Sequence, residues 1–355
     1  MKILFIIPYP EGTAPSQRFR FEQYFEDLII NGHQYTVSPF MGRNTWSVLY
    51  KPRKYLFKTF GILKGYLRRG RDIFRAWRYD FIFIHREAAP LGPPVFEWVM
   101  AKCFRKKIIF DFDDAIWIPN SSEHNFFVNR LKRYKNTQDI IRWSYRISCG
   151  NPYLQEYASQ FNQHAVFNPT VIDTAYYVPG KYAKKTSKFV IGWTGSHSTM
   201  QYLDSIVPLI RKLEKELDFE FHVISDKAPS FDCLSLIFKK WNKATEIEDL
   251  QQFDIGLMPL TDDKWAMGKC GFKALQYLAL EIPAVISPVG INSTIVTHGE
   301  NGFLCSTIDE WEITIRKLYH DKILVSEIKK RTRKVVEEKF SVNAHRNTFL
   351  HLFDN

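Results

Sequence analysis

The sequence predicts an α/β protein with two doubly wound parallel-sheet domains, and three observations carry this prediction. Short apolar segments alternate with longer amphipathic ones, which is the pattern of parallel strands joined by helices. The chain has 355 residues, more than one ordinary hydrophobic core supports. A polar stretch with two prolines, Asn168–Lys188, divides the chain and is typical of a linker.

The first half contains the alternation expected of a Rossmann-like domain over residues 1–170. The expected strands are Lys2–Ile7, Gln34–Val37, Phe81–His85, Lys107–Asp111, Arg146–Cys149 and His164–Phe167. The expected helices are Ser16–Ile30, much of Arg53–Trp77, Pro94–Phe104, Asn125–Tyr134, Asp139–Tyr145 and Tyr153–Gln160.

The second half repeats the pattern and predicts another Rossmann-like domain over residues 186–339. The expected strands are Phe189–Trp193, Glu220–Ile224, Ser235–Phe238, Asp254–Met258 and Ala284–Ser287. The expected helices are Thr199–Leu217, Ile247–Gln252, Gly271–Leu280, Asn292–Thr297, Thr307–His320, and two amphipathic helices over about Val325–Glu338 and Val342–Leu352.

Composition excludes several classes of protein. The five cysteines are scattered and form no Cys-x-x-Cys pair, so neither a disulfide framework nor a zinc site is expected. No stretch approaches the roughly 20 apolar residues that a membrane span requires. We therefore expect a cytoplasmic protein, either soluble or held peripherally on the inner face of the cytoplasmic membrane.

The net charge is +11, and residues 51–78 hold ten Lys or Arg against one Asp, with aromatic and aliphatic residues between them. A basic amphipathic helix is typical of an element that binds an anionic membrane surface. The alternative is an ordinary helix that packs its apolar side on the first domain. Nucleic acid is not an expected partner, because no recognition motif accompanies the charge.

In open parallel sheets, ligands bind at the carboxyl ends of the strands, and polar clusters gather at those ends here. Gly195 and Ser196 suit a turn whose N–H groups meet a diphosphate; the alternative is a plain strand-to-helix turn capped by Ser198. Lys269 and Lys273 lie beside a helix start, where charge and free N–H groups favour phosphate. The alternative for both lysines is a solvated surface position.

Three segments carry a family resemblance: LQYLALEIPAVISPVGINSTIVTHGENGFL, which includes Gly290, then IGWTGSHST and KILFIIPYP. They resemble nucleotide-sugar glycosyltransferases of the two-Rossmann-domain (GT-B) type, and most closely glycosyltransferase family four (glycosyl transferases group 1). The resemblance implies two domains facing a cleft, an N-terminal acceptor domain, a C-terminal donor domain, and a last helix (340–355) that crosses back. It implies retaining transfer of a sugar from a nucleotide-diphosphate-sugar to a hydroxyl of a glycan or lipid-linked acceptor, in cell-surface glycan or polysaccharide synthesis.

The chain departs from that family at the usual Glu-x7-Glu pair, which falls on Gly268 and Gln276. Gln276 would still reach the ribose hydroxyls, and Gly290 would line the donor site. The missing carboxylates favour an alternative function, a non-catalytic nucleotide-sugar or glycan binder on the same fold. A dinucleotide oxidoreductase is disfavoured because no Gly-x-Gly-x-x-Gly follows the first strand.

The first domain supplies the candidate catalytic and anion-binding residues. Arg18 and Arg20 are expected to bind the diphosphate or an anionic acceptor, or else to carry charge near a helix start; Arg86 is a further candidate for that anion. His85 is a catalytic candidate, with a structural strand-end histidine as its alternative. Asp113 and Asp114 would orient the acceptor hydroxyl or act as base.

Residues 111–117, DFDDAIW, also contain an Asp-x-Asp pattern that binds metal in another glycosyltransferase class. Two lysines already neutralise the departing phosphates here. We therefore expect neither a metal nor any other cofactor, with the nucleotide-sugar as a substrate.

Overall fold

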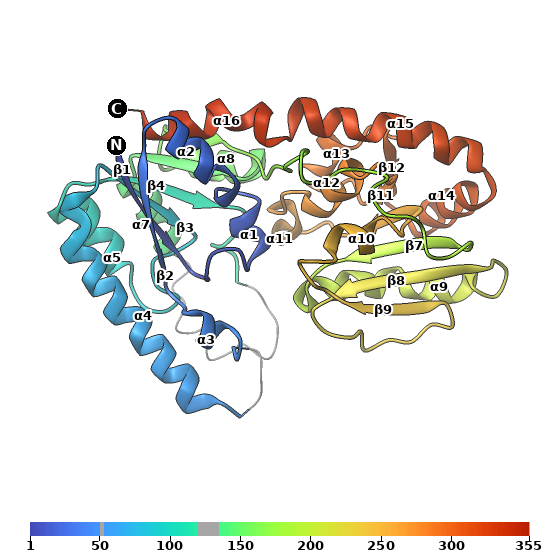
Figure 1. Ribbon diagram of the computed structural model, residues 1–355, viewed down its shortest axis with the longest axis horizontal. Coiled ribbons are helices and arrows are strands. Elements are labelled where there is room, and N and C mark those ends of the chain that lie inside the picture. Colours follow the sequence, from blue (N-terminus) through green and yellow to red (C-terminus); the bar gives the residue numbers. More distant parts are fainter. Residues whose placement is uncertain (50–52, 120–134, 355) are drawn as a thin grey trace. The chain divides into compact units, whose positions relative to one another are not determined.

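The computed structural model describes residues 1–49, 53–119 and 135–354 (Figure 1). The expected helix Asn125–Tyr134 lies outside the described residues. The chain divides into two compact units. Unit 1 consists of Met1–Thr170, Gly268–Cys270 and His345–Asn355, and unit 2 consists of Val171–Met267 and Gly271–Ala344. Each unit holds a six-stranded sheet whose described strand pairs are all parallel, which confirms the predicted fold class.

The sheet of unit 1 has the strand order β2-β1-β3-β4-β5-β6. Its strands are β1 (Lys2–Ile7), β2 (Gln34–Pro39), β3 (Phe81–His85), β4 (Lys107–Phe112), β5 (Arg146–Cys149) and β6 (Ala165–Phe167). The helices are α1 (Pro15–Arg18), η1 (Glu22–Tyr24), α2 (Phe25–Ile30), α3 (Arg43–Trp46), α4 (Tyr55–Arg75), η2 (Ala76–Arg78), α5 (Val95–Trp98), η3 (Val99–Cys103), α7 (Asn136–Trp143) and α8 (Pro152–Ser159).

The core of unit 1 is aromatic. The ring of Phe5 on β1 lies 4.9 Å from that of Phe83 on β3 and 5.6 Å from that of Phe21. The end of the chain completes this core: residues 345–355 group with unit 1, and Phe349 stacks on Tyr24 at 4.4 Å.

The single helix expected over Ser16–Ile30 is divided into α1, η1 and α2. The three consecutive residues Phe19, Arg20 and Phe21 are all buried. Successive residues of a regular α-helix point about 100° apart, so a surface helix cannot bury three in a row. The chain therefore leaves the helical path after Arg18 and resumes it three residues later, at Glu22.

The sheet of unit 2 has the order β12-β11-β10-β7-β8-β9. Its strands are β7 (Phe189–Thr194), β8 (Phe219–Ser225), β9 (Leu236–Lys240), β10 (Ile255–Met258), β11 (Ala284–Ile286) and β12 (Gly302–Leu304). The helices are η5 (His197–Ser205), α9 (Val207–Leu213), α10 (Glu246–Leu250), α11 (Lys264–Met267), α12 (Phe272–Ala279), α13 (Asn292–Ile295), α14 (Ile308–His320) and α15 (Lys322–Lys339), followed by α16 (Val342–Leu350) and η6 (His351–Phe353) at the end of the chain.

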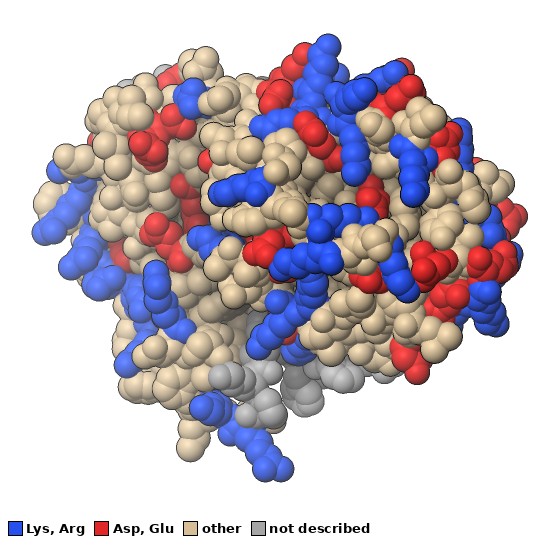
Figure 2. Space-filling view, turned by 45° about the vertical axis from the view of Figure 1, so that its right-hand side comes forward, with Lys and Arg blue, Asp and Glu red and all other residues tan. Residues whose placement is uncertain are grey.

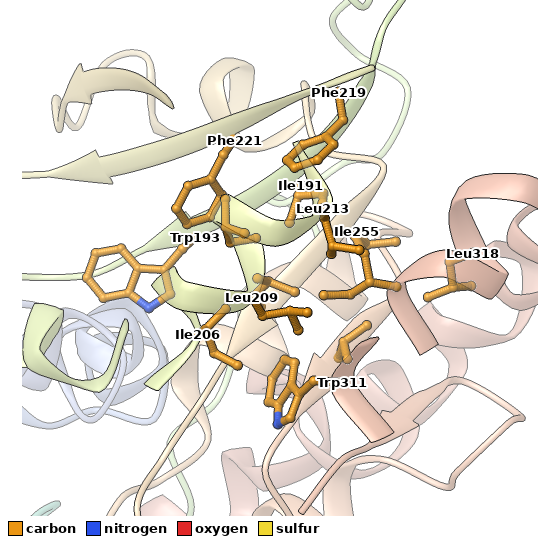
Figure 3. Packing of buried hydrophobic residues seen from close by; sticks show 14 of the residues in the cluster. Ile191, Trp193, Ile206, Leu209, Leu213, Phe219, Phe221, Ile255, Trp311 and Leu318 are labelled. Carbon is orange, nitrogen blue, oxygen red and sulfur yellow. The ribbon is translucent and has the colours of Figure 1, made fainter. Parts of the chain in front are cut away.

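Aliphatic side chains, phenylalanines and two tryptophans fill one face of this sheet (Figure 3). Trp193 comes from β7 and Trp311 from α14, and both are almost fully buried. Two predictions differ here. The helix expected over Thr199–Leu217 is a 3₁₀ segment followed by α9, because Pro208 in the first turn of α9 starts a new helix. Strand β12, which has three residues, was not expected from the sequence.

The stretch expected to be a polar linker begins at the boundary between the units but packs within unit 2. Val171, Ile172 and Tyr177 are buried. Arg333 on α15 holds the stretch by donating to the carbonyls of Tyr177 and Thr174 at 2.6 and 2.7 Å. Only the part after Tyr177 is largely exposed.

The order of strands fixes where ligand sites belong. In unit 1 the chain moves from β1 to β2 on one side and then to β3 on the other, and in unit 2 it moves from β7 to β8 and later to β10 on the opposite side. We call the place where the strand order changes direction the reversal point. In open parallel sheets a crevice forms there, outside the carboxyl ends of the two neighbouring strands. No helix among the described residues is both long enough and apolar enough to span a bilayer.

Candidate functional site

The turn after β7 lies at the reversal point of unit 2. The N–H of Gly195 donates to the carbonyl of Ile224 at 3.0 Å, and a Cβ at position 195 would lie 2.6 Å from the Trp193 ring. Only glycine fits this turn. Ser196, and not Ser198, occupies the N-cap position of η5, and its exposed hydroxyl lies 2.8 Å from that of Ser198. The turn thus exposes small polar groups.

Helix α12 points its first turn at the same place. Its N-cap, Gly271, has a φ of +66°, a left-handed conformation that favours glycine. The hydroxyl of Tyr277 accepts from the N–H of Thr194 at 3.1 Å and donates to the carbonyl of Leu257 at 3.2 Å. Because these groups belong to β7 and β10, the tyrosine fixes the helix over the reversal point. Lys273 in the first turn of α12 lies 5.6 Å above the Trp193 ring.

Gly290 closes the loop after β11. Its φ is +58°, and a Cβ there would lie 2.8 Å from the carbonyl oxygen of Met267. The loop after β11 therefore approaches the end of α11 so closely that only glycine fits at position 290. Gly195, Ser196, Lys273 and Gly290 all lie in loops or first turns at the carboxyl ends of β7, β10 and β11, where a phosphate site is expected.

Gln276 has different surroundings from those expected. Its side chain is buried, and its amide donates to the hydroxyl of Tyr177 at 3.0 Å, with the Glu246 carboxylate 3.4 Å away. Tyr177 in turn donates to Glu246 at 3.0 Å. Gln276 is thus a member of a buried chain of hydrogen bonds inside unit 2, and ribose binding by this residue stays a prediction.

The residues predicted in unit 1 gather at the ends of β3 and β4. His85 is fully buried, and its Nδ1 lies 2.7 Å from Oδ2 of Asp111. Arg86 follows with a φ of +63°, a strained conformation for a residue with a side chain. Its guanidinium lies 2.7 Å from Asp113 and 2.8 Å from Asp114. Burial lowers the pKa of Arg86, but these two carboxylates outweigh it and the pKa lies above its usual range.

Lys269 extends this cluster. The segment Gly268–Cys270 groups with unit 1, where the Lys269 ammonium lies 2.8 Å from Oδ1 of Asp114. Asn151 donates to the backbone carbonyl of Lys269 at 2.9 Å. The ammonium of Lys269 thus has a carboxylate partner in this structure. To make its predicted contact with phosphate, Lys269 would have to leave Asp114 and bind the phosphate instead.

The two arginines of the first loop differ. Arg18 is half-buried at the end of α1, with its guanidinium 4.8 Å from the Phe19 ring. Arg20, predicted to bind a diphosphate or an anionic acceptor, is fully buried, and its guanidinium donates to Asp111, to the carbonyl of Asn168 and to Ser148. The prediction for Arg20 is corrected, because its charged group already serves as the counterion of a buried carboxylate.

The Asp-x-Asp pattern is also explained by this network. Among the described residues no group of three or more His, Cys, Asp or Glu side chains is arranged to hold a metal ion. Both oxygens of Asp111 accept hydrogen bonds from protein groups, and Asp113 pairs with Arg86. Sequence reasoning gave no site role to Asp111, Tyr277 or Glu246. Only Asp111 left a signal, as a carboxylate inside an otherwise apolar strand.

Comparison with known proteins shows what this chain is similar to. The three-dimensional fold is that of GT-B glycosyltransferases. It matches sucrose-phosphate synthase (tll1590) from Thermosynechococcus elongatus over 99% of this chain and 98% of that chain, with a TM-score of 0.69 and 12% identity. It matches a glycosyltransferase from Rickettsia africae ESF-5 over 99% and 97%, with a TM-score of 0.68 and 12% identity.

A third match is Anabaena Alr3699/HepE in complex with UDP-glucose, with 99% and 98% coverage, a TM-score of 0.65 and 14% identity. The family model described as "Glycosyl transferases group 1" matches residues 188–321, which contain the site of unit 2. The predicted resemblance to this family is confirmed. No curated protein matches the sequence.

Proposed function

We propose that the protein transfers a sugar from a nucleotide-diphosphate-sugar to a hydroxyl acceptor, with retention of anomeric configuration. The observation that carries this proposal is the gathering of Gly195, Ser196 and Lys273 at the reversal point of unit 2, inside the residues that match the family model. The structure of the Anabaena relative is a complex with UDP-glucose, which makes a UDP-sugar the first donor to test.

The site residues divide the chemistry between them. In unit 2, the turn N–H groups, the start of α12 and Lys273 would bind the diphosphate and stabilise its charge as it departs. In unit 1, His85, Asp113 and Asp114 would hold the acceptor hydroxyl, and Arg18 or Arg86 would meet an anionic group. No metal enters this scheme, because positive charge comes from lysine and from helix N–H groups.

A thermal-shift screen against nucleoside diphosphates and nucleotide-sugars tests the first step. A ligand at 100 times its Kd should stabilise the protein by about 2.7 kcal/mol. Incubation of the stabilising nucleotide-sugar with the protein and glycan acceptors should then release the nucleoside diphosphate. Binding without release would favour the alternative, a non-catalytic binder, and the absence of any stabilising nucleotide would refute the proposal.

We also propose that the acceptor is glycan attached to lipid, and that helix α4 brings the enzyme to an anionic membrane surface. An ordinary surface helix buries its apolar side chains, whereas α4 exposes its large apolar side chains and buries glycines and an ion pair. Its buried face consists of Gly61, Gly65, Arg69 and Asp72. A Cβ at Gly61 would lie 2.4 Å from Thr45, and one at Gly65 would lie 2.6 Å from Phe40.

Close backbone approach and an ion pair thus hold the most buried positions of this face, and the half-buried ring of Tyr66 packs beside them. Arg69 lies 2.8 Å from Asp72 and donates to the carbonyls of Ile7 and Ala88 at 2.9 and 2.6 Å. The most buried positions of α4 are two glycines and an ion pair, and this supports the proposal over the alternative in which the helix packs an apolar side on the first domain. Arg69 is also excluded as a contact to lipid.

The outward face is apolar and basic. Leu56, Phe60, Leu63, Leu67 and Phe74 recur at helical spacing and are between 55% and 88% exposed. The exposed basic residues of the helix include Lys64, Arg71 and Arg75, which share a neighbouring strip of its surface. Basic side chains stand along the left of Figure 2, the side on which α4 lies in Figure 1. An apolar stripe beside a basic strip suits the boundary between headgroups and acyl chains.

A further inference from the structure

The buried pair of His85 and Asp111 determines which nitrogen of the imidazole carries hydrogen. Nδ1 of His85 lies 2.7 Å from Oδ2 of Asp111, and both side chains are fully buried. An ionised carboxylate only accepts hydrogen bonds, so Nδ1 must be the donor. Burial raises the pKa of Asp111, but Arg20 and the hydrogen bond from His85 outweigh it, and the pKa is held below its usual range.

The carboxylate of Asp111 is fixed on its other side. Its Oδ1 accepts from Nη2 of Arg20 and from the hydroxyl of Ser148, the latter at 2.6 Å. Arg20 is held in turn by Ser148 at 3.1 Å and by the carbonyl of Asn168. Rotation of the carboxylate would break several buried hydrogen bonds at once, so Oδ2 stays directed at His85.

The second nitrogen of His85 is oriented by the same contact. Nε2 is buried and has no hydrogen-bond partner among the residues that the structure describes. Oδ1 of Asp113 lies 3.9 Å from it, too far for a hydrogen bond. Asp111 pairs with Arg20, and Asp113 pairs with Arg86, so each of the two carboxylates near His85 already has an arginine partner. A neutral ring with hydrogen on Nδ1 leaves Nε2 as an acceptor.

We propose that Asp111 is a positioning residue that fixes His85 as the Nδ1–H tautomer, so that Nε2 accepts a hydrogen bond from a sugar hydroxyl. The nature of the hydroxyl rests on the proposed function, whereas the tautomer does not. The hydroxyl belongs either to the donor sugar or to the acceptor, and both present the same O–H to the ring nitrogen.

Asp111→Asn is a sharp test because the neighbours dictate how the amide turns. Arg20 has only donors, so the oxygen of the introduced amide must stay with it. The NH₂ group then faces His85, Nδ1 becomes the acceptor, and the hydrogen moves to Nε2. The variant keeps the shape of the side chain and reverses the tautomer. Ser148→Ala is the matched control, since it removes one contact to Asp111 and leaves Oδ2 in place.

The tautomer is measured by NMR of protein labelled with nitrogen-15 in histidine, with His85 assigned by its loss in His85→Gln. Wild type and Ser148→Ala should both show a protonated Nδ1 and an unprotonated Nε2, and Asp111→Asn should show the reverse. A wild-type His85 protonated at Nε2, or at both nitrogens, overturns the assignment. Because the wild-type spectrum alone decides this point, a failure of Asp111→Asn to fold leaves the test intact.

UDP and UDP-glucose are the probes for the hydroxyl. A change at Nε2 with UDP-glucose but not with UDP assigns the hydroxyl to the donor sugar. If UDP-glucose leaves Nε2 unchanged and Asp111→Asn lowers kcat/KM about tenfold, as loss of one hydrogen bond predicts, the acceptor supplies it. An unchanged Nε2 together with unchanged kcat/KM overturns the contact. If the wild type binds no nucleotide-sugar, the proposed function fails while the tautomer result stands.

Discussion

Removing three charges from α4 tests whether its outward face binds lipid. Lys64, Arg71 and Arg75 are all exposed, and replacing each with Gln leaves the buried pair of Arg69 and Asp72 intact. Each basic side chain near an anionic surface contributes about 1 kcal/mol, so the triple variant should lose about 3 kcal/mol. That corresponds to roughly a 100-fold weaker partition onto anionic vesicles.

Vesicle flotation measures this loss directly. Wild type should bind vesicles of phosphatidylcholine mixed with phosphatidylglycerol, bind phosphatidylcholine alone more weakly, and dissociate at high salt, because surface charges are screened within about 10 Å at 0.1 M. The matched control replaces the exposed residues Lys215, Lys243 and Lys330 of unit 2 with Gln, which gives the same change in net charge.

Two results would refute the reasoning. Equal losses in the α4 variant and in the control would show that net charge matters and the face does not. A wild type that ignores anionic vesicles at low salt would show that the face is merely solvated. Replacing Leu63, Leu67 and Phe74 with Ser should weaken binding to both kinds of vesicle, because the apolar contribution does not depend on headgroup charge.

Three further predictions concern the donor site, metal and pH. Lys273→Ala should weaken binding of the nucleoside diphosphate about tenfold or more, through loss of a charge-assisted contact, and calorimetry should show little change for the free nucleoside; equal losses would indicate a structural role. A chelator should leave sugar transfer unchanged, and restoration of a lost rate by Mg²⁺ or Mn²⁺ would contradict the structural role given to Asp111 and Asp113. Burial raises the pKa of Glu97 from 4.5 to about 7, so its contribution to stability is fully present below pH 4.5 and is lost as the pH rises through 7. That loss is about 3 kcal/mol in urea unfolding, and Glu97→Gln should abolish it; an equal pH dependence in the variant would exclude Glu97 as its source.

The sequence was sufficient to predict the sheets but not the surroundings of individual polar side chains. Strands such as Lys2–Ile7 and Phe81–His85 appear where expected, because a short continuous apolar run in an α/β chain is typical of a parallel strand that is buried on both faces. The reversal points follow from the strand order, and they explain why polar residues after β7 and β4 were found as candidates. Local pattern is enough for these features.

Arg20 and α4 show why the rest could not be predicted. Arg20 lies in a segment expected to be helical, and nothing local shows that Asp111, ninety-one positions further along, takes it as a counterion. In α4, the inward-packing glycines leave no apolar signal, so the sequence pattern alone left two interpretations open, a membrane-binding face and an apolar side packed on the first domain. In both cases the deciding contacts join segments distant in the sequence, which periodicity does not encode.

The buried chain around Gln276 explains how a glutamine is accommodated where the family that this chain resembles usually has glutamate. The amide of Gln276 donates to Tyr177, and Tyr177 donates to Glu246, so the chain runs in one direction and ends on a carboxylate. Trp241 also donates to Glu246, at 3.1 Å. Gln276→Glu would remove the first donor and place a second carboxylate beside Glu246. We expect it to lower the free energy of unfolding by about 1–3 kcal/mol, the cost of an unsatisfied buried group.

The double variant Gln276→Glu with Glu246→Gln should recover most of that loss. Its amide at position 246 accepts from Trp241 and donates to Tyr177, which then donates to the carboxylate at 276, so the same chain runs in reverse. A double-mutant cycle by urea unfolding should give a coupling of about 1 kcal/mol or more between the two sites. If Gln276→Glu is as stable as wild type, or if the two losses simply add, the hydrogen-bond chain does not determine the choice of residue at position 276. A requirement of the ligand would then be the better explanation for the glutamine.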